Sequence, residues 1–382
     1  MIEENKNFKI MIVDDSKFMR MLLEDILKKE GYTVKSYERA LIAKDDLDKF
    51  SPHLILSDFL MPEMNGYEFC EYVKKEKKYD VKFILVTSVT DVDNKVKCFE
   101  VGADDYITKP FNAKEVIARV ATHLKIKILT DRLQNALERI NKDLEIVRFI
   151  QLSLVPEKFP QFENLKFTYY YNIMHKTGGD YLDYLILNDS KLGVIVADVE
   201  GHGIYSTVFM AIIKTIVNTD LKKIIDTSDA LTLLNNDILS LTKETKFATV
   251  FYGIIDIENL VLSYSNAGHH EPVLINRKNG EISLLKCKKG FPVGLFKANS
   301  DTYGSNKINL KKDDRIFIFT DGILEAKNDN GELFGEKRFL ELVKNTKDLN
   351  SEDAKELILE RINEFANKNL DDDITLLIID VV

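Results

Sequence analysis

A stretch of 30 residues without glycine or proline, 126–155, divides this chain of 382 residues into two regions with different patterns. Within the stretch, apolar residues recur every seven positions, at Ile126, Leu133, Ile140, Val147 and Leu154. A second heptad position, three residues after the first, holds Leu129, Ala136 and Ile150, and Asp143 interrupts this series. The pattern predicts a helix of about 45 Å that carries an apolar stripe.

Two interpretations of this helix are open. The stripe can meet the same stripe of a second copy, which would give a homodimer through a coiled coil. The helix can instead pack as an amphipathic linker against the domains of its own chain. Because Pro156 and Pro160 mark its end, we expect one domain at 1–125, a helical linker at 126–155 and a second domain at 156–382.

The region before the linker alternates short apolar runs with amphipathic segments. Strands are expected at 8–13, 33–37, 53–57, 81–87 and 106–108. Helices are expected at 17–30, from the loop at 61–66 to about residue 77, and at 112–125. This alternation is typical of an α/β fold with a doubly wound, parallel, five-stranded sheet. In such sheets, ligands bind at the carboxyl ends of the strands.

Polar side chains with reactive chemistry gather at those strand ends. In chain order they are Asp14, Asp15, Asp58, Thr87 and Lys109. Carboxylates that lie close together repel one another and favour a divalent cation such as magnesium. One carboxylate can then attack phosphorus, while a lysine and a hydroxyl offset the charge on the transferred phosphoryl group.

The motifs around these residues resemble the receiver domain of bacterial response regulators (CheY-like). They are VDDS, SDFLMPEMNG, VTS and DDYITKPF, and the resemblance covers residues 8 to about 125. It implies that a cognate histidine kinase phosphorylates Asp58. It also implies that Asp15, Asp58 and the Leu60 carbonyl hold Mg²⁺, with Asp14 acting through water.

The same resemblance assigns roles to three further residues. Lys109 would pair with the phosphate, and the Lys109–Pro110 bond would be cis. Thr87 and Tyr106 would form the switch pair. Asn65 stands where the family commonly has Asp before the turn glycine, and we expect this difference to have no cost.

The region after the linker is rich in strands, which precede and follow helices in pairs. Strands are expected at 165–173, 181–187, 192–197, 247–257, 261–265, 273–275, 282–285, 315–319 and 375–381. Helices are expected at 204–217, 230–241, 336–343 and 354–365. This order predicts an α+β domain with antiparallel sheets.

Aspartates recur in this region at strand ends or in glycine turns. They are Asp180, Asp198, Asp321, Asp372 and Asp373. Because glycine lets the backbone approach a ligand closely, these carboxylates could meet around two divalent cations that hydrolyse a phosphate ester. The sequence contains neither GxSxG nor a Cys–x₅–Arg loop, so no serine or cysteine nucleophile motif competes.

Seven motifs of this region resemble, in their order, the bacterial metal-dependent Ser/Thr phosphatases of the 2C type, of the RsbU/SpoIIE subgroup. They are GGDYLDYL, ADVEGHG, FATVFYGIID, SNAGHHEP, GFPVGLF, FTDGILEA and DDDITLLI. The segment RFIQLSLVPEKFP resembles the lead-in of that subgroup, so the likeness spans about 146–382. It implies a layered sandwich of two antiparallel sheets between helices, with two Mn²⁺ or Mg²⁺ ions.

The resemblance also implies site residues. Asp198 and the carbonyl of Val199 would bind both metals, and the rest of the shell would come from Asp180, Asp321, Asp372 and the adjoining Asp373. Glu200 stands where relatives with DGHG have a histidine, so the general acid is either His202 or a metal-bound water. We interpret His269 and His270 as residues that shape their loop.

Together, the two resemblances imply a response regulator whose output is a phosphatase controlled by phosphorylation of Asp58. The implied substrate is a phosphoserine or phosphothreonine on an anti-sigma-factor antagonist in a partner-switching pathway. We hypothesise that the helix at 112–155 moves Asp180 or Asp372 into or out of position. The alternative is a phosphorylation-gated adaptor without catalysis, and a weaker third option is a phosphatase of small phosphate esters.

Composition narrows the possible partners and location. The net charge is −9 and no block of Lys or Arg stands out, so no nucleic-acid partner is expected. The longest apolar runs are strand-sized and the first residues lack a signal-peptide pattern, so we expect a cytoplasmic protein without a membrane segment. The three scattered cysteines, Cys70, Cys98 and Cys287, are interpreted as free thiols.

Overall fold

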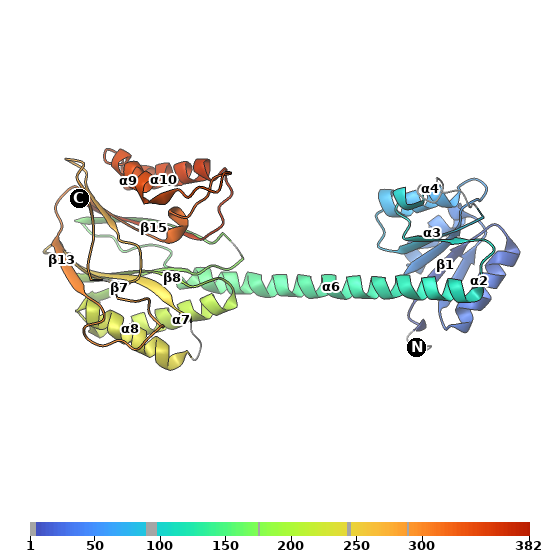
Figure 1. Cartoon of the computed structure of the whole chain (residues 1–382), viewed down its shortest axis with the longest axis horizontal. Coiled ribbons are helices and arrows are strands. Elements are labelled where there is room, and N and C mark those ends of the chain that lie inside the picture. Colours follow the sequence, from blue (N-terminus) through green and yellow to red (C-terminus); the bar gives the residue numbers. More distant parts are fainter. Residues whose placement is uncertain (1–4, 89–97, 175, 243–245, 289) are drawn as a thin grey trace. The chain divides into compact units, whose positions relative to one another are not determined.

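The computed structural model describes residues 5–88, 98–174, 176–242, 246–288 and 290–382. It contains two compact units, residues 1–139 and 140–382 (Figure 1).

The first unit contains the predicted five-stranded parallel sheet. Its strands are β1 (Lys9–Val13), β2 (Thr33–Tyr37), β3 (Leu54–Asp58), β4 (Lys82–Thr87) and β5 (Asp105–Thr108), in the order β2-β1-β3-β4-β5. Alternate residues face opposite sides, so Met11 packs with α3 (Ala40–Phe50) and α4 (Gly66–Glu71), whereas Ile12 packs with α2 (Lys17–Lys29). The doubly wound α/β prediction is therefore confirmed. The described helices also include η1 (Tyr72–Glu76), which continues α4.

Helix α6 (Ala113–Leu154) joins two segments that the sequence analysis treated separately, the helix at 112–125 and the linker at 126–155. It continues because no glycine or proline interrupts it. Its first part belongs to the receiver core, through Val116 and Val120, and its last part belongs to the second unit. Along the stripe, Leu129 and Leu133 are 55% and 62% exposed. The proposed homodimer stays a prediction.

The second unit contains two five-stranded antiparallel sheets, as predicted. One sheet has the order β13-β10-β9-β8-β7, with β7 (Asp180–Asn188), β8 (Lys191–Val199), β9 (Ala248–Asp256), β10 (Val261–Ala267) and β13 (Ser305–Asn309). The other has the order β12-β11-β14-β15-β6, with β6 (Leu165–Asn172), β11 (Val273–Asn276), β12 (Ile282–Leu284), β14 (Asp314–Phe319) and β15 (Ile374–Val381).

Helices cover the outer faces of both sheets (Figure 1). Helices α7 (Ile204–Thr219) and α8 (Thr227–Leu241) pack on the first sheet, and α9 (Gly335–Asn345) and α10 (Ser351–Phe365) pack on the second. A third apolar core lies between the sheets, where residues such as Val196 and Leu377 meet. The layers therefore confirm the predicted sandwich, with short helices η2 (Leu221–Lys223) and η3 (Asp321–Ile323) in its connections.

One segment of the described chain, Ile204–Lys223, is long and apolar enough to cross a membrane by length and composition. It is longer than the strand-sized runs that we expected. It contains α7, whose residues Phe209, Ile213 and Val217 are buried in the core of the first sheet. We interpret it as a core helix, since buried helices of globular domains are apolar for the same reason.

The cysteines carry free thiols, as predicted. Cys70 and Cys98 are buried, and Cys287 is half-buried. Burial raises the pKa of Cys70 to about 12, so this thiol stays protonated at neutral pH.

Candidate active sites

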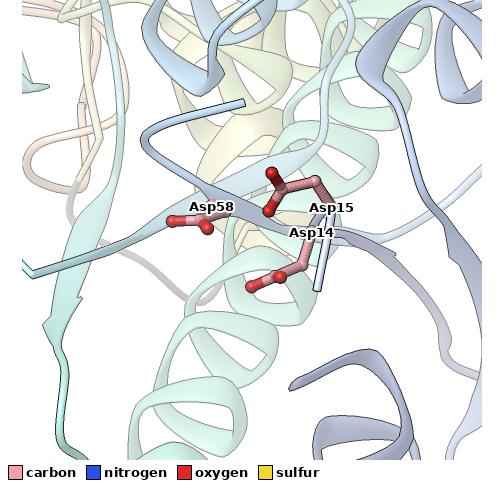
Figure 2. Close-up of side chains that lie close together, drawn as sticks. All are labelled: Asp14, Asp15 and Asp58. Carbon is pink, nitrogen blue, oxygen red and sulfur yellow. The ribbon is translucent and has the colours of Figure 1, made fainter. Parts of the chain in front are cut away.

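Three carboxylates meet at the carboxyl edge of the receiver sheet. Figure 2 shows Asp14, Asp15 and Asp58 together, and one oxygen of each lies within 4.8 Å of the others. They come from the ends of β1 and β3, which are parallel neighbours, so the sheet topology alone brings them together. Asp14 and Asp58 are buried and Asp15 is exposed, which leaves the cluster open to solvent on one side.

Lys109 adds a positive charge to this cluster. Its Nζ donates to Asp58 Oδ2 at 2.8 Å and to Asp14 Oδ2 at 3.1 Å, and the Lys109–Pro110 bond is cis, as predicted. Burial raises the pKa of Asp58 above its ordinary value, although Lys109 opposes this effect. Burial acts to lower the pKa of Lys109, but Asp58 and Asp14 raise it overall, so the ammonium is maintained.

The other predicted receiver residues surround this edge. Thr87 ends β4 and is buried, and its carbonyl accepts a hydrogen bond from the Lys109 N–H at 2.7 Å. Tyr106 lies in β5 with its ring edge-to-face with Phe99 at 5.9 Å. Leu60 follows β3 and is 60% exposed. The switch role of Thr87 and Tyr106 and the Leu60 metal contact remain predictions.

The loop after Asp58 requires a glycine at one position. A Cβ atom on Gly66 would lie 2.0 Å from the Asp58 carbonyl oxygen, so no larger residue fits where α4 begins beside β3. Asn65 caps α4, because its side chain accepts from the Glu68 N–H at 2.9 Å while Glu68 accepts from the Asn65 N–H at 3.0 Å. Asparagine therefore supplies the cap that this position needs, and the expected lack of cost stays a prediction.

In the second unit, carboxylates from both sheets converge. Asp180 and Asp198 lie directly opposite each other in the β7–β8 register. Asp321 opens η3 after β14, and Asp372 precedes β15. Burial raises the pKa of Asp198 to about 7, helped by the charges of Asp321, Asp372 and Asp373. The charge of Asp372 therefore acts on Asp198, although the two aspartates are more than 170 residues apart in the sequence.

Asp180 connects the two sheets. It is buried, and its Oδ2 accepts hydrogen bonds from the hydroxyls of Thr320 and Thr375, both at 2.6 Å. Burial raises the pKa of Asp180 well above its ordinary value, and the charge of Asp198 adds to this. Neither threonine was predicted as a site residue, although both lie inside the motifs FTDGILEA and DDDITLLI.

A glycine before Asp180 allows the backbone of the neighbouring turn to approach. A Cβ atom on Gly179 would lie 2.4 Å from the Val199 carbonyl oxygen, 3.0 Å from the Gly201 carbonyl oxygen and 3.3 Å from Asp198 Oδ1. Three oxygen atoms therefore gather around one point. This places the predicted ligands Asp198 and Val199 side by side.

Asp373 holds the glycine loop. Its Oδ1 accepts from the Met174 N–H at 2.9 Å, and its Oδ2 accepts from the Gly179 N–H at 2.7 Å. A Cβ atom on Gly178 would lie 1.9 Å from the same Oδ2, which explains the glycine pair. Asp373 thus positions the loop through both carboxylate oxygens, and its metal contact stays a prediction.

Glu325 is a site residue that the sequence analysis missed. One carboxylate oxygen each of Asp321, Glu325 and Asp372 lie within 4.8 Å of one another. Burial raises the pKa of Asp321 to about 6, and the charges of Asp372 and Glu325 add to the shift. The spacing from Asp321 to Glu325 is one helical turn, and that spacing is the signal that could have revealed it.

Gln151, near the end of α6, is a second missed residue. Its side chain is fully buried and forms two hydrogen bonds with Gly178. The Gln151 Nε2 donates to the Gly178 carbonyl at 2.6 Å, and the Gln151 Oε1 accepts from the Gly178 N–H at 3.0 Å. Lys214 of α7 also holds this helix end, since its Nζ donates to the Leu154 carbonyl at 2.6 Å and to Asp183 at 3.0 Å. The end of α6 is therefore fixed to the loop that carries Asp180.

The histidines differ in their surroundings. His202 is exposed in the turn after Asp198, and its role as general acid stays a prediction. His269 is buried, and its ring Nδ1 lies 2.8 Å from the Thr249 hydroxyl. The backbone N–H of His269 donates to Asn266 Oδ1 at 2.7 Å. His270 stacks on Phe319 at 6.1 Å. This geometry agrees with a loop-shaping role for the pair.

Comparisons with known proteins agree with both halves. The profile of the family described as Stage II sporulation protein E (SpoIIE) matches residues 188–382, and that of the response regulator receiver domain matches residues 10–121. The solved SiaA-PP2C domain of Pseudomonas aeruginosa has a TM-score of 0.57 at 16% identity, covering 65% of this chain and 99% of its own. The solved RsbU and RsbW domains of a Mycobacterium tuberculosis protein have a TM-score of 0.50 at 22% identity, and the match covers 57% of this chain and 60% of that chain.

At these identities the two structures show the fold alone. The SpoIIE profile, however, spans about half of the chain, and the receiver profile covers most of the first unit. The chain belongs to the SpoIIE family, with a phosphatase domain of the 2C type that follows an N-terminal response regulator receiver domain.

Proposed function

We propose that this protein is a response regulator whose output is a metal-dependent protein serine/threonine phosphatase, controlled by phosphorylation of Asp58. The observation that carries the phosphatase assignment is the convergence of Asp198, Asp321 and Asp372 from separate strand ends. In our proposal the receiver occupies 1–125, the linker 126–155 and the phosphatase domain 156–382.

The donor set of the second site fits Mn²⁺ or Mg²⁺. Asp198, the Val199 carbonyl, Asp321 and Asp372 are all oxygen donors, which hard divalent cations prefer. Two such ions would act as Lewis acids and lower the pKa of water. The two threonine partners of Asp180 fix the orientation of its carboxylate.

The receiver supplies the control. A histidine kinase would donate phosphate to Asp58, with Mg²⁺ held by Asp15, Asp58 and the Leu60 carbonyl, and with Asp14 beside them. Lys109 Nζ donates to the Asp58 carboxylate at 2.8 Å, so after phosphorylation its ammonium would pair with the phosphoryl oxygens. Thr87 and Tyr106 would respond to that change.

Helix α6 would transmit the signal. Its Lys127, 7% exposed, pairs with Asp80 at 2.6 Å in the receiver unit, and its Gln151 holds Gly178 in the phosphatase unit. A change in α6, supported by coiled-coil pairing with a second copy, would therefore move the loop that carries Asp180. Sedimentation with and without beryllofluoride tests the coiled-coil pairing. If activity changes while the mass and the helix packing stay the same, the coiled-coil mechanism is refuted.

For the substrate, we propose a phosphoserine or phosphothreonine on an anti-sigma-factor antagonist. The support is membership of the SpoIIE family and the fold shared with a protein that carries RsbU and RsbW domains. A protein substrate needs an open site, and both Glu325 and Asp372 at this centre are exposed.

The test is Mn²⁺-dependent hydrolysis of p-nitrophenyl phosphate and of phosphorylated antagonists by the full chain. Asp198→Ala and Asp321→Ala are expected to abolish hydrolysis, and beryllofluoride is expected to change the rate except in Asp58→Asn. Activity that survives both alanine variants would refute the metal assignment. A chain that binds an antagonist but hydrolyses neither substrate would instead support the adaptor function.

A further inference from the structure

We propose that Lys246 binds the phosphoryl group of the substrate, and that Glu200 competes with this group for the lysine ammonium. The inference rests on the proposed phosphatase function and adds a substrate-binding position to it. It starts from the ion pair between Lys246 Nζ and Glu200 Oε2, which lie 3.5 Å apart.

Strand register places Lys246 beside the turn that follows Asp198. In the β8–β9 pair, Asp198 is opposite Thr249, and beyond it the Glu200 N–H donates to the Phe247 carbonyl at 2.9 Å. Lys246 is the next residue along this edge, so it faces Gly201. A Cβ atom on Gly201 would lie 3.5 Å from Lys246 Nζ.

The turn that Lys246 faces is the one that carries the predicted metal ligands. The carbonyl oxygens of Gly201 and Val199 and the carboxylate of Asp198 gather around the point where a Gly179 Cβ would lie. The ammonium of Lys246 therefore lies beside the turn that carries Asp198 and Val199.

The backbone of Lys246 is held in place. A Cβ atom on Gly294 would lie 2.7 Å from the Lys246 carbonyl oxygen, so the GFPVGLF loop packs tightly against this residue. The Gly294 φ angle of +95° also favours glycine there. The long side chain can thus move while its base stays fixed.

Charge explains why a cation is useful at this position. Asp198, Asp321, Glu325 and Asp372 all repel an incoming phosphate dianion, and a lysine on the border offsets part of that repulsion. Lys246 and Glu200 are 36% and 42% exposed, and exposed pairs of this kind hold each other weakly. A doubly charged phosphoryl group can therefore displace the Glu200 carboxylate from the ammonium.

Two substitutions with opposite expected effects test the proposal in the full chain. Lys246→Met is expected to raise KM for p-nitrophenyl phosphate and the inhibition constant of inorganic phosphate by about tenfold, because one charge-assisted hydrogen bond is lost. The effect on kcat is expected to be smaller. Glu200→Gln is expected to lower both constants, since it removes the competing charge. Lys246→Arg is expected to retain binding.

Lys222→Met is the matched control. It removes an exposed lysine in η2, beyond the far end of α7, a helix of 16 residues and therefore about 24 Å long. We expect wild-type constants from it. Thermal unfolding of each variant checks folding, and the Arg and Gln variants keep the test valid where Lys246→Met fails to fold.

Calorimetric binding of inorganic phosphate in saturating Mn²⁺ gives a readout that does not depend on turnover. Weaker binding in Lys246→Met and tighter binding in Glu200→Gln would support the proposal. Wild-type binding in Lys246→Met, or equal weakening in both variants, would overturn it, because the second result describes a structural ion pair. A wild-type chain that hydrolyses nothing would refute the proposed function instead, while the binding comparison would still decide the role of Lys246.

Discussion

Replacing Gln151 by methionine tests whether the end of α6 holds the loop of the phosphatase site. Methionine keeps the length of the side chain, but its thioether donates no hydrogen bond and accepts only weakly. The change would therefore leave the N–H and the carbonyl of Gly178 without their Gln151 partners, in a position where the glutamine is fully buried.

The structure gives an expected magnitude. A buried backbone group that loses its partner costs about 1–3 kcal/mol, so two such groups are expected to lower the free energy of local opening by about 2–6 kcal/mol. The bonds that still hold the described part of the loop include Gly179 N–H to Asp373 at 2.7 Å and Val199 N–H to the Gly179 carbonyl at 3.0 Å. Since this loop leads directly into Asp180, we also expect the Mn²⁺ concentration at half-maximal activity to rise.

Hydrogen exchange measured by mass spectrometry, in peptides that contain Gly178 and Gly179, reports this opening. Each 1.4 kcal/mol corresponds to a factor of about ten in the exchange rate, so the lower bound of about 2 kcal/mol predicts an increase of at least about 25-fold. Gln134→Met, an exposed change on the same helix, is the control and should leave exchange unchanged. Wild-type exchange in Gln151→Met would refute the reasoning, as would faster exchange with an unchanged Mn²⁺ requirement.

Three further substitutions test other parts of the fold. Burial acts to raise the pKa of Asp104, but ion pairs with two lysines bring it below its usual 3.8, so its stabilisation is complete above about pH 4–5 and is lost as the pH falls through the lowered value. Asp104→Asn should reduce the loss of receiver stability as the pH falls below about 5, and an unchanged dependence of stability on pH in that range would contradict this. Arg315 is fully buried and donates to Asp380 at 2.8 Å, so Arg315→Met should cost about 3–5 kcal/mol in urea unfolding. Asp380 would then keep only Arg277 at 3.7 Å among its described ion pairs, so adding Asp380→Leu should recover part of the loss, and no recovery would argue against the poorly paired Asp380 charge as the cause. Gly66→Ala would place a Cβ atom 2.0 Å from the Asp58 carbonyl oxygen and should lower receiver stability by about 1–3 kcal/mol and slow phosphorylation by acetyl phosphate; wild-type values of both would show that the loop relaxes freely.

The sequence could predict the receiver site well because topology determines it. Parallel strands end at one edge, so the aspartates after β1 and β3 had to meet once the strands were identified. The cis Lys109–Pro110 bond and the residues of the second site followed from resemblance, and the structure brings Asp198, Asp321 and Asp372 together.

The sequence could not predict contacts that depend on packing between distant elements. Gln151 looks like any polar residue of an amphipathic helix, and only the tertiary structure buries it against Gly178. Among the described elements, α3 and β13 were not predicted either. Helix α3 exposes Leu41 and Ile42 and lacks a side-chain cap, and β13 is a polar edge strand with the sequence SNKIN, so neither shows a clear apolar period.

Equilibrium binding of Mn²⁺ to the full chain tests the central claim most directly, namely that the second unit holds a pair of metal ions. Asp14→Asn and Asp15→Asn remove the receiver contribution, and electron paramagnetic resonance then counts the free ion during titration. We predict two Mn²⁺ ions per chain, with a clear loss when Asp198→Asn or Asp321→Asn is added. No binding at saturating Mn²⁺, or the same binding after either addition, would contradict the claim.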